Sequence, residues 1–422
     1  MNNKMYIPKI KKHIFRLITI SIPIIFLILI EVTIRSCAGE KLKIQPITFD
    51  LYTPKYYTMF GHPIPIPDKT KNEYRIILLG GSTAAGFPKE QFEQKLNRYA
   101  KLNNVNRKFS FYNLAWPSYQ STQEFIQLYQ HALDAKPDFI ITMHGTNDFS
   151  IVINHDYEPG EPVYFENFKN LLIFGGFISE IKFNYILHNI LLRYSYIYRQ
   201  MSFTFSKIAG DKDSGLKMKC NRLFHYKKSK NYDTSMREKI LKLYSKNIDV
   251  MAALTNHYKI KFLASIQPMF FGKNILSDSE REKKIRSVKE YEKIKNDKNP
   301  IVEVKEDLNI ALSDEFEIVF NQFYNILAQY KKKHVNKTFY YENFSYLFYN
   351  IKDTIFSDSC HFAPNFTKDN IAKGYAPIMA IYFRYIMSDV TGINKYKIPI
   401  DVFDDWTSKI VKKFDKSSIM KK

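Results

Sequence analysis

The chain has 422 residues, of which 45% are hydrophobic and 16% aromatic, so it has enough apolar material for a large core and is neither disordered nor fibrous. Its 63 lysines and arginines exceed its 42 aspartates and glutamates, and the net charge of +21 favours anionic partners without choosing among them. Three cysteines are too few for a disulfide scaffold or a zinc ribbon. In an oxidising compartment, one disulfide at most could form among Cys37, Cys220 and Cys360.

An almost uninterrupted apolar run, residues 17–34, follows five lysines and arginines near the amino terminus. About 18 apolar residues is near the lower limit for crossing a bilayer, and the basic flank should stay in the cytoplasm. Glu31 and Arg35 argue against a cleaved signal peptide, and Arg35 also argues against a lipoprotein signal at Cys37. A buried helix of a soluble protein is the remaining alternative. We therefore expect residues 1–36 to form a basic flank and an uncleaved single-pass anchor, with the main domain periplasmic or at the cell surface.

Apolar strands alternate with helical segments from residue 74 onward, after a Pro- and Tyr-rich connector at residues 37–73. This alternation predicts an α/β domain with a mainly parallel sheet, whose functional groups gather at the carboxyl ends of the strands. The strands are expected at residues 74–79, 109–114, 138–143 and 261–266, and the helices at residues 88–102, 122–133 and 239–257.

The domain is expected to span residues 74–390 and to contain two insertions. Residues 149–236 are aromatic and increasingly basic, whereas residues 272–333 are charged and helix-prone. The charged stretch within the second insertion is typical of a solvated helix or mobile loop, with a binding lid as the alternative. Residues 391–422 are expected to form a basic C-terminal tail.

Small or polar residues follow the first two predicted strands. The Gly-Gly-Ser-Thr turn at residues 80–83 would expose the Ser82 hydroxyl close to the free N–H groups of the next helix. The turn lacks the patterns of a P-loop and of a dinucleotide-binding loop, and Ala84 replaces the second glycine of a GxSxG elbow. At residues 113–117, Asn-Leu-Ala-Trp-Pro, the small Ala115 would let its backbone N–H approach a ligand.

Two further segments supply complementary groups. Residues 144–148, His-Gly-Thr-Asn-Asp, place the Asn147 amide after the third strand. Near the end of the chain, Asp358 and His361 have a spacing of three residues, which allows a carboxylate to orient an imidazole base at one site. Cys360 adjoins His361 in sequence, which is a poor geometry for a cysteine nucleophile.

In this order, the four segments resemble the sequence blocks of the SGNH (GDSL-like) hydrolase family, in its membrane-anchored bacterial form. The resemblance covers residues 74–387 without the insertions, and it implies a three-layer α/β/α sandwich with a mainly parallel, five-stranded sheet of the flavodoxin-like type. It also implies Ser82 as nucleophile, His361 as base, Asp358 as its carboxylate partner, and oxyanion donors at Ser82, Ala115 and Asn147. Two departures are visible, since Ala115 replaces a family glycine and no aspartate precedes Ser82.

The resemblance implies a serine esterase that acts on acyl esters, and we expect its substrates to be acetyl esters of cell-envelope polysaccharide. The same residues would serve an O-acyltransferase if a sugar hydroxyl replaced water, and a catalytically silent glycan-binding protein is the third reading. Gln267, at the end of the fourth strand, is a candidate for lining the cleft, with a strand-terminal cap as the alternative. No metal, cofactor or nucleic-acid partner is expected. The expected partners are an acylated small molecule or glycan and, through the N-terminal helix, a membrane, while the oligomeric state stays open.

Overall fold

The computed structural model describes residues 66–155, 159–160, 225–227, 234–295, 301–303, 306–334, 338–367 and 370–420, all within one compact unit of the chain. The expected anchor at residues 17–34 and most of the connector and the first insertion lie outside the described residues. Among the described residues, no helix combines the length and the apolar character needed to cross a membrane.

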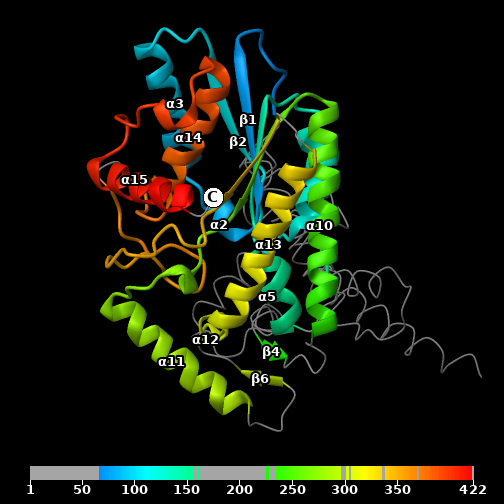
Figure 1. Ribbon diagram of the computed structural model, residues 1–422, viewed down its shortest axis with the longest axis vertical. Coiled ribbons are helices and arrows are strands. Elements are labelled where there is room, and N and C mark those ends of the chain that lie inside the picture. The colour runs from blue at the N-terminus through cyan, green and yellow to red at the C-terminus, as the bar shows by residue number, and fades with distance from the viewer. Residues whose placement is uncertain are drawn as a thin grey trace, which may run out of the picture. The chain divides into compact units, whose positions relative to one another are not determined.

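Five parallel strands form the central sheet, in the order β2-β1-β3-β5-β7 (Figure 1). The strands are β1 (Glu73–Gly80), β2 (Lys108–Asn113), β3 (Phe139–His144), β5 (Lys261–Ile266) and β7 (Phe339–Asn343). This confirms the expected five-stranded parallel sheet. The strand order reverses between β1 and β3, and ligands of such sheets bind outside the carboxyl ends of the strands at this point.

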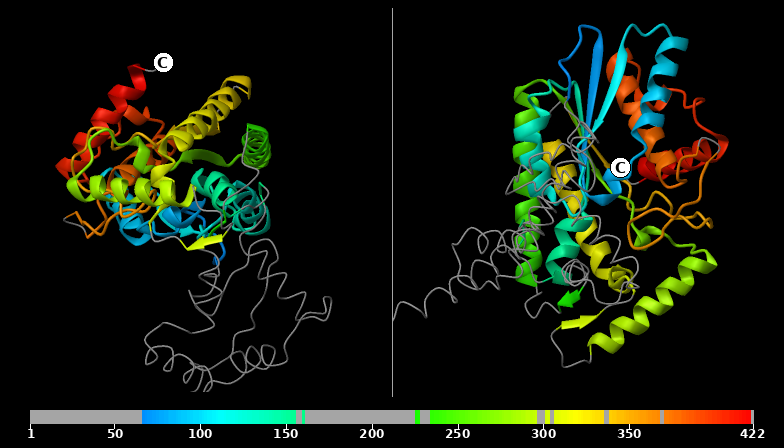
Figure 2. Two further views of the ribbon diagram at one scale, coloured as in Figure 1. Left: turned by 90° about the horizontal axis from the view of Figure 1, so that it is seen from below. Right: turned by 180° about the vertical axis from the view of Figure 1, so that it is seen from behind.

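Helices cover both faces of the sheet because successive side chains of a strand point to opposite faces. In β1, Ile76 and Leu78 join one core, whereas Ile77 and Leu79 join the other. Figure 2 shows the two helical layers on either side of the strands. One layer consists of α3 (Lys89–Leu102), α14 (Tyr375–Thr391) and α15 (Asp405–Met420), and the other of α4 (Ser121–Gln127), α10 (Thr234–His257) and α13 (Ser313–His334).

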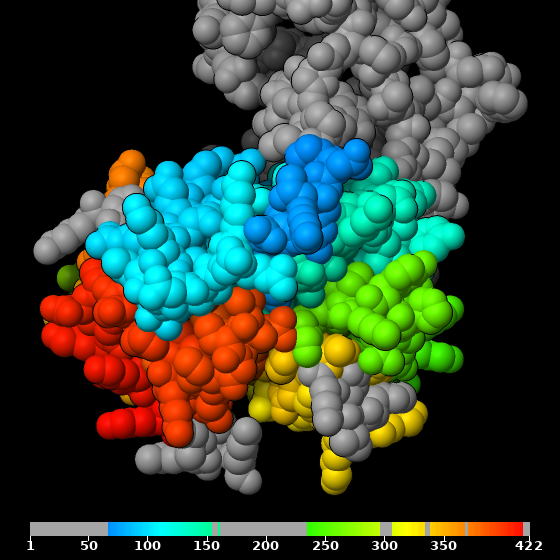
Figure 3. Space-filling view, turned by 90° about the horizontal axis from the view of Figure 1, so that it is seen from above, coloured from blue at the N-terminus to red at the C-terminus, as the bar shows by residue number. Residues whose placement is uncertain are grey.

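Aromatic side chains pack between the helices of each layer. Seen from above in Figure 3, α3 (cyan) lies beside α14 (orange), and α10 (green) lies beside α13 (yellow). The rings of Tyr99 on α3 and Phe383 on α14 meet edge to face, with their centroids 5.0 Å apart. On the opposite face, the rings of Tyr244 on α10 and Phe323 on α13 have centroids 4.1 Å apart.

The structure departs from the expected boundaries at three places. Helix α13 lies within the region expected as the second insertion, yet its fully buried Phe316 and Phe320 pack in the core against the sheet. Helix α15 lies within the expected basic tail, yet its buried Ile410 and Val411 belong to the core of the other face. The fifth strand, β7, was not predicted from the sequence. Its residues, Phe-Tyr-Tyr-Glu-Asn, include no aliphatic side chain and do not form the apolar run typical of a buried strand.

Shorter elements gather beyond the carboxyl ends of the strands (Figure 1). Helix α2 (Ser82–Ala85) follows β1, and α5 (Thr146–His155) follows β3. Helices α11 (Asp278–Lys295) and α12 (Leu308–Ala311) come between β5 and α13, and the short strand β4 (His225–Lys227) pairs antiparallel with β6 (Ile301–Glu303). The candidate site lies at this end of the sheet.

Candidate active site

Ser82 begins helix α2 directly after β1, at the position where the strand order reverses. The turn needs the preceding glycine, because Gly80 has φ +153° and a Cβ there would lie 2.5 Å from the Met143 carbonyl oxygen. As the first residue of a helix, Ser82 has a backbone N–H with no acceptor within the helix. The turn therefore presents both a hydroxyl and an N–H donor at the carboxyl edge of the sheet.

The structure brings Ser82, His361 and Asp358 together. His361 Nε2 lies 2.6 Å from Ser82 Oγ, and His361 Nδ1 lies 2.7 Å from Asp358 Oδ2. The carboxylate assigns the tautomer, since Nδ1 must donate to Asp358 and Nε2 is then free to accept from Ser82. These distances are within the range needed for proton transfer between a nucleophile and its base.

The loop that carries the pair is tightly wound. The second carboxylate oxygen of Asp358, Oδ1, accepts hydrogen bonds from the backbone N–H groups of Cys360 at 2.9 Å and His361 at 2.7 Å. The Ser357 N–H donates to the His361 carbonyl oxygen at 2.9 Å. Asp358 is thereby fixed to the backbone of the residue that it orients.

Charge and hydrogen bonding set the protonation of this group. The hydrogen bond to Asp358 is the main cause that raises the pKa of His361, and the nearby Cys360 adds to it. Burial opposes ionisation of Asp358, but hydrogen bonds from His361 and from the backbone outweigh it and lower the pKa of the carboxyl group. Burial raises the pKa of the Cys360 thiol, which disfavours the reactive thiolate.

Asn147 lies close to Ser82. Its Nδ2 donates to the Tyr119 carbonyl oxygen at 2.9 Å, and a Cβ placed on Gly81 would lie only 2.4 Å from the same Nδ2. An amide nitrogen carries two N–H donors, so one is left for a ligand beside Ser82. The Asn147 amide thus lies beside the turn that carries Ser82, and its role as an oxyanion donor stays a prediction.

The Ala115 N–H is not free, which corrects the expectation that it would face an oxyanion. It donates to the Asn113 Oδ1 atom at 3.0 Å, within a turn that ends β2. Ser118, three residues later, has φ +65°, a backbone conformation that is rare outside glycine. The Ser118 N–H donates no hydrogen bond within the described part of the chain.

The loop around Ser118 packs against the turn that carries Ser82. The Trp116 N–H donates to the Gly80 carbonyl oxygen at 2.9 Å, and the Tyr119 carbonyl oxygen accepts from Asn147. Ser118 lies between these two anchor points, which makes its N–H a candidate for the second backbone donor near Ser82. Sequence reasoning missed Ser118, because a serine after Trp-Pro does not reveal a positive φ.

Gln267 is buried and does not line an open cleft, contrary to expectation. Its side chain is in a residue only 3% exposed, and its Nε2 donates to the Thr83 Oγ1 atom at 3.4 Å. Thr83 Oγ1 in turn donates to the Cys360 carbonyl oxygen at 3.2 Å. Gln267 therefore supports the contact between α2 and the loop of His361.

A buried polar cluster holds the two segments that flank the site. Asp148 accepts hydrogen bonds from the Ser121 N–H at 3.0 Å and from the Ser121 Oγ at 2.5 Å, which ties α5 to α4. Next to it, His144 Nδ1 lies 3.0 Å from Glu124 Oε2, and His144 Nε2 lies 2.8 Å from the Tyr244 hydroxyl. Burial, followed by the charge of Glu124, raises the pKa of Asp148 to about 6.

One group of described residues has ligand atoms close enough to hold a metal ion. The ligand atoms of Asp358, Cys360 and His361 lie within 4.8 Å of one another. However, the nitrogen of His361 nearest to the other two residues, Nδ1, is bonded to Asp358, so an ion there would break the link between base and carboxylate. The expected absence of a metal stays a prediction.

A pocket of about 300 Å³ lies beside α2 and the end of β2. It is lined by one charged pair and by apolar or polar neighbours of the nucleophile turn: Ala85, Phe87, Lys89, Glu90, Asn113 and Ala115. Lys89 Nζ and Glu90 Oε1 are 3.6 Å apart, so the two charges largely offset each other. The pocket can accept a small group but offers no strong preference for either sign of charge.

No protein-family model and no curated protein sequence matches the chain. Among solved structures, it is similar to a GDSL-like lipase from Bacteroides thetaiotaomicron, with 12% identity, a TM-score of 0.33, and coverage of 76% of this chain and 92% of that one. It is also similar to the lipase/acylhydrolase from Enterococcus faecalis (11% identity, TM-score 0.35, 75% and 96% coverage) and to an acetyl xylan esterase (11%, 0.33, 68% and 91%). At such low TM-scores, these similarities carry no argument about fold or function.

Proposed function

We propose that the protein is a serine esterase of the SGNH type that cleaves acyl esters through an acyl-serine intermediate. The observation that carries the proposal is the continuous chain of contacts from Ser82 Oγ through both nitrogens of His361 to Asp358, with distances of 2.6 and 2.7 Å. A serine hydroxyl is a weak nucleophile until a base of this kind takes its proton. The GxND and DxxH patterns of the sequence support the same family.

The mechanism follows from the positions of the groups. His361 Nε2 takes the proton of Ser82 as Oγ attacks the ester carbonyl carbon, and Asp358 stabilises the charged imidazole. The oxyanion is held by the N–H groups of Ser82 and Ser118 and by the Asn147 amide. When the tetrahedral intermediate collapses, His361 returns the proton to the leaving alcohol. Water, activated by the same base, then releases the acid from Ser82.

We further propose that the substrates are acetylated polysaccharides of the cell envelope and that the domain is held outside the cytoplasm by residues 17–34. The apolar run and its basic flank support the location, and the net charge of +21 is compatible with an acidic glycan surface. A fusion of two reporters to the carboxyl terminus of the full chain tests the topology. Activity of the cytoplasmic reporter alone would contradict it.

Two other functions use the same site. An O-acyltransferase would pass the acyl group from Ser82 to a sugar hydroxyl, and a glycan-binding protein would use the fold without chemistry. Acyl transfer to added oligosaccharide in excess of hydrolysis would favour the first. If the wild-type and Ser82→Ala proteins both retained glycan and neither turned over an ester, the glycan-binding function would be favoured.

The direct test of the proposed function is hydrolysis of an aryl acetate by the purified protein. Ser82→Ala should abolish turnover and leave the circular dichroism spectrum unchanged, since one hydroxyl is removed from a partly exposed site. Ser388→Ala on α14 is the matched control and should retain full activity. Turnover by Ser82→Ala equal to that of the wild type would refute the proposal.

A further inference from the structure

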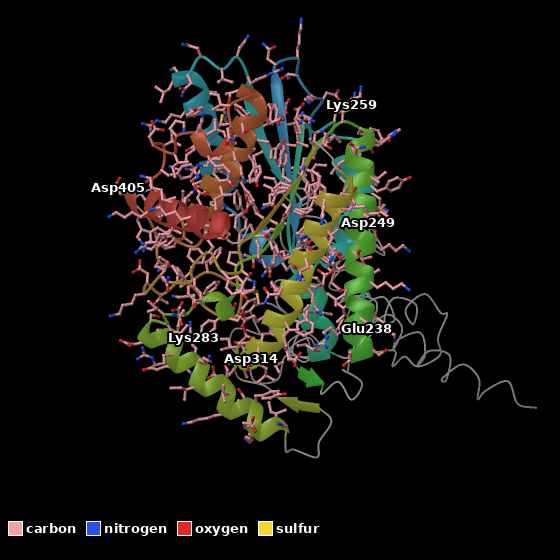
Figure 4. The ribbon with its side chains drawn as sticks, viewed as in Figure 1. Glu238, Asp249, Lys259, Lys283, Asp314 and Asp405 are labelled. Carbon is pink, nitrogen blue, oxygen red and sulfur yellow. The ribbon has the colours of Figure 1, made fainter. Side chains whose placement is uncertain are left out.

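The loop that carries Asp358 and His361 is held by a segment outside the sheet. Between β5 and α13, the described residues 273–295, with α11, and 306–312, with α12, contact residues 353–359 at several points. In Figure 4, Lys283 projects from α11, and its Nζ donates to the Phe356 carbonyl oxygen at 3.3 Å. The Thr354 hydroxyl donates to the Ser277 Oγ atom at 2.8 Å.

A buried ion pair forms the first firm attachment. Lys273 Nζ and Glu280 Oε2 are 2.7 Å apart, and neither side chain is exposed to solvent. The other oxygen of Glu280 accepts from the N–H groups of Ile355 at 2.9 Å and Phe356 at 3.1 Å. Lys273 also donates to the Asp353 carbonyl oxygen at 2.6 Å. Through Glu280 Oε1 and Lys273 Nζ, the pair thus holds the backbone that leads into the loop of Asp358.

Asp307 forms the second attachment, immediately beside the catalytic carboxylate. Its Oδ2 accepts from the Ser359 N–H at 2.6 Å, and its Oδ1 accepts from the Asn309 N–H at the start of α12. The Ser359 carbonyl oxygen accepts from the Phe270 N–H at 2.9 Å. Both the N–H and the carbonyl oxygen of Ser359, the residue after Asp358, are therefore hydrogen-bonded.

We propose that Asp307 and Glu280 are positioning residues that hold His361 and Asp358 at the correct distance from Ser82. The inference rests on the proposed function. Hydrogen bonds from N–H groups to a carboxylate are shorter and stronger than those between neutral groups, which suits them to fixing a loop. Because Asp358 is bonded to the N–H groups of its own loop, a shift of Ser359 moves the carboxylate and the imidazole together.

Removal of the Asp307 carboxylate should therefore reduce kcat more than it changes KM. A misplacement of about 1 Å of a catalytic group can cost about 10²-fold in rate, so we expect a loss of about 10- to 100-fold in kcat for Asp307→Ala. Asp307→Asn keeps an oxygen that can accept the Ser359 N–H, and it should restore most of the lost rate. If Asp307 had only a structural role, Asp307→Asn would not restore kcat relative to Asp307→Ala when the two variants have equal thermal stability.

A double-mutant cycle with His361→Ala separates positioning from general damage, with aryl acetate hydrolysis as the readout. In the His361→Ala background, Asp307→Ala should cause no further loss, because there is no imidazole left to position. Asp404→Ala is the matched control: Asp404 Oδ1 accepts from the Thr407 N–H at 2.7 Å at the start of α15, away from this loop, and its loss should leave kcat unchanged.

Unchanged kcat in Asp307→Ala would overturn the inference, as would equal losses in both backgrounds. If Asp307→Ala does not fold, Glu280→Gln takes its place in the cycle, because it keeps the size of the side chain but loses one acceptor oxygen, and the same two outcomes decide. Failure of the proposed function is distinguishable, since full turnover by Ser82→Ala refutes both proposals. Loss of turnover in Ser82→Ala, with full activity in both positioning variants, refutes the positioning proposal alone.

Discussion

Gly81 leaves room for the Asn147 amide beside Ser82, so we expect a methyl group added at Gly81 to displace the proposed oxyanion donor. A Cβ at this position would lie 2.4 Å from Asn147 Nδ2 and 3.3 Å from the Tyr119 carbonyl oxygen. Since such atoms prefer about 3.5 Å, Nδ2 must move by about 1 Å in Gly81→Ala. Gly81 has φ −84°, which alanine adopts without strain, and the displaced atom ends a flexible side chain. Stability should therefore change little.

Activity should fall much more than stability. Loss of one oxyanion donor typically costs about 10²- to 10³-fold in kcat, and a displacement of about 1 Å costs about 10²-fold. We expect Gly81→Ala to lower kcat for an aryl acetate about 10²-fold, which corresponds to about 2.7 kcal/mol of transition-state stabilisation. In an Asn147→Ala background, the same substitution should have no further effect. Wild-type kcat in Gly81→Ala, or an equal loss in both backgrounds, would refute the assigned role of Asn147.

Three further predictions concern single side chains. Asp358→Asn should lower kcat about 10⁴-fold by disturbing the tautomer of His361. Because Asp358 raises the pKa of His361, the acid limb of the pH profile of kcat/KM should also shift to lower pH, and an unshifted limb would contradict this. Ser118→Gly should retain activity, and its free energy of unfolding in urea should rise by about 1 kcal/mol, since glycine adopts the left-handed conformation without strain. A loss of stability would contradict this prediction. The pKa of Asp148 is raised from 3.8 to about 6, so the folded state favours the protonated carboxyl group. The contribution of this group to the free energy of unfolding is therefore complete below about pH 4, and it falls by about 3 kcal/mol as the pH rises through 6. Urea unfolding of wild-type protein, measured against Asp148→Asn between pH 4 and 7, should show this decline, and a pH-independent difference would argue against it.

The sequence predicted those parts of the fold whose pattern is set by burial alone. Strands β1, β3 and β5 are buried on both faces and therefore appear as short apolar runs, and β5 was placed at its observed bounds. Strand β7 lies at an edge of the sheet, where only Phe339 is fully buried, so its aromatic and polar residues carry a weaker pattern. Helix α13 was assigned to an insertion because its phenylalanines are interspersed with charged residues.

The site was predictable to the extent that it depends on residue type and order. Ser82, Asp358 and His361 carry chemistry that their side chains alone reveal. The backbone donors depend instead on which N–H groups remain available, and nothing in the sequence distinguishes the N–H of Ala115, which bonds Asn113, from that of Ser118, which donates no hydrogen bond among the described residues. Acidic residues such as Asp307 have no motif, since their role comes from contacts across about fifty residues of chain.

Covalent labelling of the purified protein with a fluorophosphonate tests the central claim most directly, because the probe reacts with a serine that a neighbouring base has activated. Mass spectrometry of the digested product should place a single phosphonate on Ser82. Labelling should become much slower in His361→Ala and should be absent in Ser82→Ala. A well-folded wild-type protein that stays unlabelled, or that carries the probe on another residue, would contradict the assignment of Ser82 as the nucleophile.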